Sequence, residues 1–121
     1  MRNQAQKYAS ENIEEFITQL QDFLRIPSVA ARGEGIDEAV AWLQTRLQAT
    51  GLEVEVVATT GNPVVIAEAP QVEGPTILFY GHYDVQPEDP IEEWEYPPFE
   101  AKRVEDRIYA RGAVDNKGNF L

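Results

Sequence analysis

Apolar residues recur every three or four positions between residues 13 and 24, a spacing that predicts an amphipathic helix. Ser10 precedes this stretch and is placed to cap its N-terminus. A proline disfavours helical geometry in the residue before it, so Pro27 should end the helix near Arg25. We expect the polar residues 1–9 to be frayed and the apolar face of the helix to pack inward as core.

A second helix is predicted from residue 36 onward. Its apolar side chains share one face and are Ile36, Ala39, Val40, Leu43 and Leu47. Gly51 stands where a glycine commonly ends a helix. The chain therefore opens with two helices, each with one face suited to a hydrophobic core.

Three short stretches after these helices have the character of strands. Residues 52–57 alternate between apolar and polar, which predicts a strand with one face in water. Residues 64–67 are continuously apolar, which predicts a strand buried on both faces. Residues 76–80 form a third apolar run, expected to be a buried strand that leads into a polar segment. Helices followed by strands of this kind predict an α/β fold.

The last third of the chain is less regular. The acidic, proline-rich residues 87–98 are expected to form either a solvated loop that pins Trp94 to the core or one wall of a cleft. Residues 99–110 predict a hairpin. Residues 117–121 have the character of the first turn of a helix, and a single turn is not stable by itself. We therefore expect the chain to be the front part of a larger protein.

Composition narrows the function classes. A net charge of −11, from 21 acidic and 10 basic residues, repels phosphate backbones and argues against a nucleic-acid partner. The chain has no cysteine, which excludes disulfides, thiolate metal sites and a cysteine nucleophile. No secretory signal and no membrane-spanning run is visible, so the expectation is a soluble cytoplasmic protein without a membrane partner.

The candidate chemistry lies at the end of the third predicted strand. His82 is the only histidine, and Asp84 lies on the same face if the backbone stays extended. A metal-bound imidazole normally donates its other N–H to a carboxylate or carbonyl. Asp115, on a glycine-flanked loop, is a candidate oxygen ligand and also a candidate cap of a following helix, and the two roles are compatible. Imidazole with carboxylates suits zinc, manganese or cobalt better than calcium.

By themselves these residues do not complete a catalytic metal site. A catalytic zinc usually has three protein ligands, and a two-metal site needs more. The carboxylates between residues 88 and 95 lack ligand spacing, so we expect them to be solvated. A lone histidine is also more often a hydrogen-bonded structural residue. No G-x-S-x-G elbow and no glycine-rich phosphate loop occurs, so serine hydrolases and nucleotide binders lack their signatures.

Residues 81–87, Gly-His-Tyr-Asp-Val-Gln-Pro, resemble a motif of the cocatalytic zinc metallopeptidases. This family includes carnosinase-type dipeptidases, aminoacylases, acetylornithine deacetylase and succinyl-diaminopimelate desuccinylase. Residues 109–118 resemble the family's second motif, and the segment 94–99 resembles the connection between the two. Residues 25–29 match the opening of the family. Tyr83 and the Gln-Pro pair after Val85 resemble the dipeptidase branch more than the deacylase branch.

The resemblance implies a fold and a set of roles. Residues 1–121 would be the N-terminal part of a mixed-sheet zinc-peptidase catalytic domain, incomplete and without the lid and dimerisation domain. His82 would ligate one zinc ion. Asp84 would serve catalysis by orienting the His82 imidazole and raising its basicity. Asp115 would bridge two zinc ions, and the resemblance also implies a cis peptide bond between Asp115 and Asn116.

The implied activity is hydrolysis of the amide bond of dipeptides or short peptides, with two zinc ions and with manganese or cobalt as alternatives. The full-length protein would be a homodimer. The general base and the remaining ligands of the family are not in this sequence, so we expect these 121 residues to be inactive alone. Two alternatives stay open at this point: an N-acyl amino acid deacylase of the same family, and a non-catalytic truncated module that binds metal weakly.

Overall fold

The computed structural model describes all 121 residues, and its N-terminal half is built from three helices. They are α1 (Arg2–Glu11), α2 (Ile13–Leu24) and α3 (Ile36–Ala49). Helix α2 ends at the predicted place, with Arg25 as its C-terminal cap. Gly51 follows α3 with φ +85°, a left-handed conformation that glycine adopts without steric cost. The chain thus turns sharply out of α3 and into the first strand.

The beginning of the chain differs from the prediction. Residues 2–11 form a helix of their own and are not frayed. Ser10 is not a cap, because it lies inside α1 and its hydroxyl donates to the carbonyls of Gln6 and Lys7. The break between the two helices falls at Asn12, whose side-chain amide donates to the Tyr8 carbonyl at 2.8 Å. The short-range hydrogen bonds available to serine and asparagine therefore decide where α1 stops and α2 begins.

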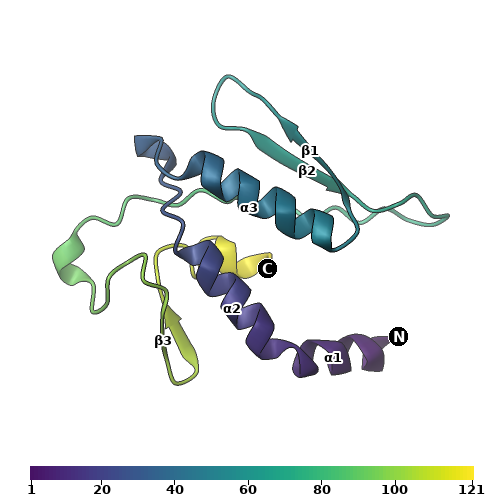
Figure 1. The fold of residues 1–121 in the computed structure, drawn as a ribbon, viewed down its shortest axis with the longest axis horizontal. Coiled ribbons are helices and arrows are strands. Elements are labelled where there is room, and N and C mark those ends of the chain that lie inside the picture. The colour runs from purple at the N-terminus through teal and green to yellow at the C-terminus, as the bar shows by residue number, and fades with distance from the viewer.

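The strands form two separate antiparallel hairpins. In the first, β1 (Glu53–Val57) pairs with β2 (Val64–Glu68), with Val57 opposite Val64. In the second, β3 (Lys102–Val104) pairs with β4 (Arg107–Tyr109). Figure 1 shows the first hairpin lying along α3, and the second as a small projection near α2. The predicted hairpin over 99–110 is confirmed, with strands shorter than the pattern indicated.

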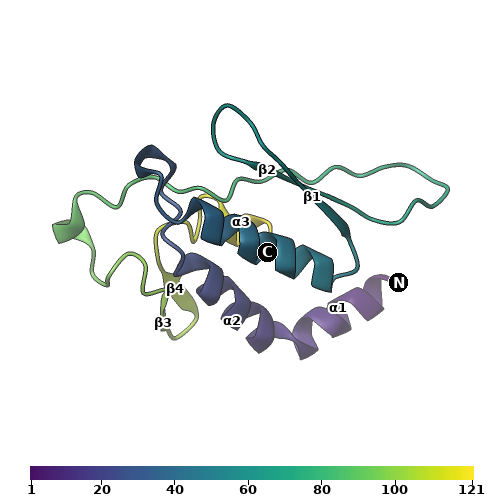
Figure 2. The same cartoon turned by 45° about the horizontal axis from the view of Figure 1, so that its top comes forward.

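Two expectations about strands are wrong. Strand β2 is covered on one face only, by α3, and its outward-facing Val64 and Ile66 are exposed. Residues 76–80 form no strand, and the side chains from Ile77 to Tyr80 are between 74% and 88% exposed. A strand needs a neighbour to satisfy its backbone hydrogen bonds, and this segment has none within the chain. Figure 2 shows it as part of the extended strip that runs past β1 and β2.

The core lies between α2 and α3. Its buried members are Phe23, Ile26, Ala39 and Leu43. The Phe23 ring stacks on Trp42 at a centroid distance of 4.4 Å and meets the edge of Phe120 at 6.0 Å. The apolar face of α2 is buried only towards its C-terminal end, because Ile13 at its start is 51% exposed. The best-packed part of the molecule is therefore the end of α2, where the two polar loops of the candidate site also meet.

The second hairpin is held to α2 by polar contacts. Arg103 donates to both carboxylate oxygens of Glu14, and the Gln21 side chain donates to the Ala101 carbonyl at 2.8 Å. These contacts fix the direction from which the chain enters residues 110–118. No helix of this chain combines the length and the apolar character needed to cross a bilayer.

Candidate functional site

The loop carrying His82 is fixed against the segment that follows α2. The Val85 amide donates to the Ser28 carbonyl at 2.8 Å, and the buried Ser28 hydroxyl donates to the Tyr83 carbonyl at 2.6 Å. The Tyr83 hydroxyl in turn donates to the Pro63 carbonyl at 2.7 Å. Val29 and Val85 form a parallel bridge between the two segments. Backbone pairing on one side therefore holds His82 and Asp84 in position.

His82 stands between two aspartates. Its Nδ1 lies 3.0 Å from the Asp84 backbone oxygen and 3.2 Å from an Asp84 carboxylate oxygen. Its Nε2 lies 3.0 Å from a carboxylate oxygen of Asp115, which is 33 residues further along the chain. The fold thus brings together all three residues that the motifs singled out. The peptide bond between Asp115 and Asn116 is cis, as the resemblance implied.

This contact pattern has a direct electrostatic consequence. Burial would lower the pKa of His82, but the hydrogen bonds to Asp84 and Asp115 and the charges of the two carboxylates outweigh burial and raise it. If Nδ1 carries its proton towards Asp84, the Nε2 lone pair of a neutral imidazole faces an Asp115 oxygen at 3.0 Å. Two lone pairs at that distance repel each other unless a positive charge lies between them. A second proton or a metal cation supplies that charge, so the donor set fits a cation at this position.

A turn of 3₁₀-helix at Lys117–Asn119 closes the Asp115 loop, and the loop is packed tightly. Lys117 is fully buried, and its ammonium group donates to the carbonyls of Phe23 at 2.9 Å and Ile26 at 2.7 Å. Burial lowers the pKa of Lys117 to about 8. The side-chain oxygen of Asn116 accepts from the His82 amide at 3.2 Å. Lys117 therefore ties the loop to the end of α2, and Asn116 ties it to the His82 loop.

Sequence reasoning missed the parts played by these two residues. The sequence pattern predicts only the opening of a helix after Asp115 and marks no contact for Asn116 or Lys117. The structure makes Asn116 the residue before the 3₁₀ turn, and no side chain caps that turn, so the capping alternative for Asp115 is wrong. A lysine in sequence carries no sign of burial, because its usual place is the protein surface. The burial of Lys117 becomes visible only in the folded chain, where the end of α2 packs against it.

The acidic loop also differs in part from the expectation. Glu88 departs from the expected solvation, because its side chain is only 13% exposed and pairs with Arg32 at 2.9 Å. Asp89 also pairs with Arg32, at 2.7 Å, but its side chain is 67% exposed, as expected. The Trp94 ring nitrogen donates to the Glu88 carbonyl at 2.8 Å, a contact inside the loop, and Trp94 is not part of the core cluster. The hydrogen bonds of His82 go to Asp84, Asp115 and Asn116, and none goes to these carboxylates. No three histidine, aspartate or glutamate side chains gather around one point as a complete set of metal ligands.

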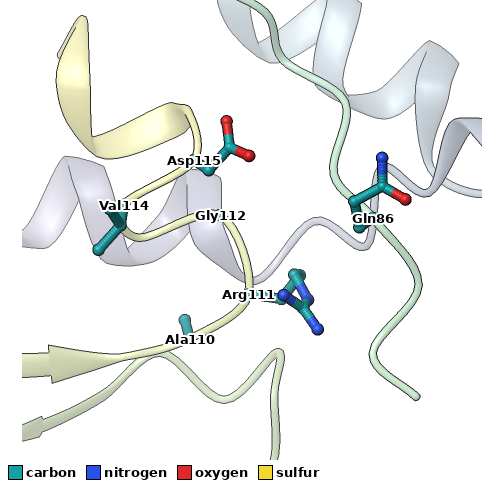
Figure 3. A pocket seen from close by; sticks show the side chains of 6 residues that line it. All are labelled: Gln86, Ala110, Arg111, Gly112, Val114 and Asp115. Carbon is teal, nitrogen blue, oxygen red and sulfur yellow. The ribbon is translucent and has the colours of Figure 1, made fainter. Parts of the chain in front are cut away.

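A shallow pocket of about 240 Å³ opens beside Asp115. Six residues line it, namely Gln86, Ala110, Arg111, Gly112, Val114 and Asp115. Figure 3 shows Gln86 and Arg111 on two separate segments at opposite sides of the opening, with Asp115 on the same loop as Arg111. The pocket therefore joins the first motif, which supplies Gln86, to the second, which supplies Arg111 and Asp115.

The segment that carries this site is similar to a known family. Residues 78–121, which contain His82, Asp84 and Asp115, match the sequence model described as peptidase family M20/M25/M40. The chain is a relative of the M20 metallopeptidases. The resemblance stated from the two motifs is thereby confirmed, and the α/β fold class is confirmed by the structures that follow.

Three solved structures are similar to this M20 relative. An M20 family metallo-carboxypeptidase, Sso-CP2 from Sulfolobus solfataricus, is 50% identical with a TM-score of 0.78, over 82% of this chain and 23% of that protein. Human carnosine dipeptidase 1 is 30% identical with a TM-score of 0.83, over 93% of this chain and 27% of that one. The di-peptidase Dug1p from Saccharomyces cerevisiae is 23% identical with a TM-score of 0.81 over the same shares, and shows the fold alone. The chain spans about a quarter of the length of the structures it matches.

Proposed function

We propose that the protein containing these residues is a metal-dependent peptidase that hydrolyses the amide bond of dipeptides or short peptides. The observation that carries the proposal is the position of His82, with Asp84 on one ring nitrogen and Asp115 at 3.0 Å from the other. The match of residues 78–121 to the M20 peptidase family model supports the same reaction class. In this proposal residues 1–121 are part of the catalytic domain, and the lid and dimerisation domain is not among them.

Each residue has a separate task in this proposal. We expect His82 Nε2 and an Asp115 oxygen to hold a metal ion. The two atoms point at each other at 3.0 Å, and an imidazole nitrogen and a carboxylate oxygen are both common ligands of zinc. Asp84 holds the imidazole so that Nε2 points at Asp115, and its negative charge increases the basicity of that nitrogen. When bound, the metal supplies an acidified water and polarises the amide carbonyl. Asp115, with 77% of its side chain exposed, has a second oxygen free for a second ion.

The proposed metal is zinc, in two ions, with manganese and cobalt as alternatives. The donor set of imidazole and carboxylate without thiolate is compatible with all three. The ligands that complete such a site would come from outside these 121 residues. We therefore propose that the isolated chain binds metal weakly and has little or no turnover. The predicted cytoplasmic location and homodimer stay predictions.

The experiment compares hydrolysis of a dipeptide panel and an N-acyl amino acid panel by the full-length protein, after metal removal by chelation and after return of zinc, manganese or cobalt. We expect activity on dipeptides that is lost on chelation and restored by metal. Activity confined to the N-acyl panel would replace the substrate class, and activity that survives complete metal removal would refute the mechanism.

Two variants tie the activity to the site. His82→Ala removes the only imidazole and should abolish metal-restored activity and weaken zinc binding measured by calorimetry. Asp106→Asn is the matched control, because Asp106 lies at the hairpin turn with its side chain 91% exposed. Zinc affinity that is equal in His82→Ala and in the unmodified protein would show that the metal is bound elsewhere.

A further inference from the structure

Two hydrogen bonds join the loop of His82 (residues 81–87) to the loop of Asp115 (residues 110–118). One links His82 Nε2 and an Asp115 oxygen at 3.0 Å, and it uses the two atoms that face the proposed metal. In the other, the His82 backbone amide donates to the side-chain oxygen of Asn116 at 3.2 Å. Only the second bond uses atoms that a metal ion between His82 and Asp115 would leave untouched. It therefore joins the two loops with or without a bound metal.

The His82 amide is also the only paired backbone donor between residues 76 and 84. The apolar side chains in the first part of this stretch are exposed and do not pack against the core. After His82 the chain is fixed again, because the Ser28 hydroxyl donates to the Tyr83 carbonyl at 2.6 Å. Asn116 therefore supplies the one hydrogen bond that orders the backbone at His82 and before it.

The backbone of Asn116 is held independently of His82. The Asn119 amide donates to the Asn116 carbonyl at 2.9 Å. The neighbouring Lys117 donates to two backbone carbonyls at the end of α2. The Asn116 side chain is partly buried, and only its oxygen accepts an N–H, which fixes the orientation of its amide group. Asn116 thus connects the well-packed end of α2 to the His82 backbone.

The two loops approach each other closely beside this hydrogen bond. A Cβ on Gly81 would lie 3.0 Å from the Asn116 side-chain oxygen and 2.6 Å from the Phe120 ring. Neither contact leaves room for a methyl group unless the ring or one of the loops shifts. Glycine at position 81 therefore lets Asn116 reach the His82 amide, and Gly81→Ala is a second way to disturb the same contact.

We propose that Asn116 is a positioning residue for the metal site, whose side-chain oxygen holds the His82 backbone so that Nε2 faces Asp115. The inference rests on the proposed metal-dependent function and adds a residue that acts through His82. Because the contact exists before a metal arrives, it reduces the cost of ordering the two loops when the ion binds. The acceptor is neutral, which suits a place where Asp84 and Asp115 already set two carboxylates beside one imidazole.

The test uses the full-length protein with cobalt and zinc as probes, because the visible spectrum of bound cobalt depends on its ligand geometry. Asn116→Leu keeps a branched side chain and removes the acceptor. It should weaken binding of both ions by about tenfold, the effect of losing a partner that orients a metal ligand. It should also change the cobalt spectrum. In the metal-free protein, it should speed hydrogen exchange of the peptide that contains the His82 amide.

Asn119→Leu is the matched control for this substitution. Asn119 lies on the same turn, its side chain is exposed, and it donates to the Val114 carbonyl without reaching His82. Its replacement should leave the cobalt spectrum and the exchange of the His82 peptide as they are in the unmodified protein. Equal changes in Asn119→Leu and Asn116→Leu would overturn the proposal, because they would show that any loosening of the loop has the same effect.

Rescue separates a role of the oxygen acceptor from a role of side-chain shape. Asn116→Asp restores an acceptor, so the exchange and the cobalt spectrum should return towards those of the unmodified protein. Affinity is left out of this comparison, because the added negative charge itself attracts a cation. Gly81→Ala should reproduce the faster exchange of Asn116→Leu. Absence of rescue, or unchanged exchange or spectrum in Asn116→Leu, would overturn the proposal. If Asn116→Leu does not fold, as judged by circular dichroism, Asn116→Ala decides by the same criteria.

Failure of the metal-dependent function is recognised separately. If the unmodified protein binds neither cobalt nor zinc, the proposed function fails. Hydrogen exchange in the metal-free proteins still tests the contact between Asn116 and His82 by itself. We then still expect faster exchange of the His82 peptide in Asn116→Leu and its reversal in Asn116→Asp, and equal rates in all three proteins would refute the role of Asn116.

Discussion

Replacement of Phe23 by alanine tests whether the end of α2 is the structural centre on which the site is built. Phe23 is fully buried and touches three other parts of the molecule. Its ring stacks on Trp42 of α3, meets the edge of Phe120, and lies 4.5 Å from the ammonium group of Lys117. Loss of this one ring would therefore loosen the contacts of α2 with α3 and with the closing loop at the same time.

The expected magnitude follows from these contacts. Truncation of a buried phenylalanine to alanine typically costs about 3–5 kcal/mol. Each aromatic pair contributes about 0.5–1.5 kcal/mol beyond the area it buries, so we expect Phe23→Ala to lie at the upper end, at about 4–5 kcal/mol. Phe23→Leu retains most of the apolar volume and loses the ring contacts, and should cost about 1–3 kcal/mol.

Urea denaturation measures these free energies of unfolding, with the fluorescence of Trp42 and Trp94 as one probe and circular dichroism as a second. Ile13→Ala in the same helix is the control. Because Ile13 is 51% exposed, its truncation should cost no more than about 1 kcal/mol. A cost below about 2 kcal/mol for Phe23→Ala would refute the reasoning, since it would mean that the ring is not tightly packed.

Three further changes probe the loops around this centre. Lys117→Met should lower the free energy of unfolding by about 2 kcal/mol. The variant loses two charge-assisted hydrogen bonds, and this loss is partly offset because an ammonium group no longer has to be buried. An unchanged urea midpoint would contradict this expectation. Gly118→Ala should weaken zinc binding more than it lowers helix content. The new Cβ would lie 2.0 Å from the Ala113 carbonyl oxygen, so the Asp115 loop has to shift. Unaltered zinc affinity, measured by calorimetry, would show that the loop tolerates the added methyl group. Glu88→Gln should destabilise the chain at neutral pH and progressively less in acid. The hydrogen bond from Arg32 lowers the pKa of Glu88 below its ordinary value of 4.5, so the stabilisation is present above pH 4.5 and is lost as the pH falls through the lower folded value. Urea midpoints of both proteins at pH 7 and pH 3 check this, and a constant difference would contradict it.

The local elements of the fold were largely predictable from the sequence. Periodicity located α2 and α3, and Pro27 and Gly51 marked their ends, because such signals act within a few residues. The helix over residues 2–11 was missed because most of its side chains are polar and none is buried, so no apolar face marks it. The strand expected over 76–80 failed for the opposite reason, since its apolar pattern is strong but nothing in this chain pairs with it.

The amino-acid sequence by itself determined the chemistry: a single histidine, an aspartate two residues away, and a second aspartate on a glycine-flanked loop, in motifs that resemble one family of metallopeptidases. Only the tertiary structure decided that His82 and Asp115, 33 residues apart, stand 3.0 Å from each other. It also decided that Lys117 is buried against the end of α2, where its ammonium group donates to the carbonyls of Phe23 and Ile26. The physical reason is that spacing along a chain fixes which residues can share a face, whereas the meeting of two loops depends on the packing of the elements that carry them.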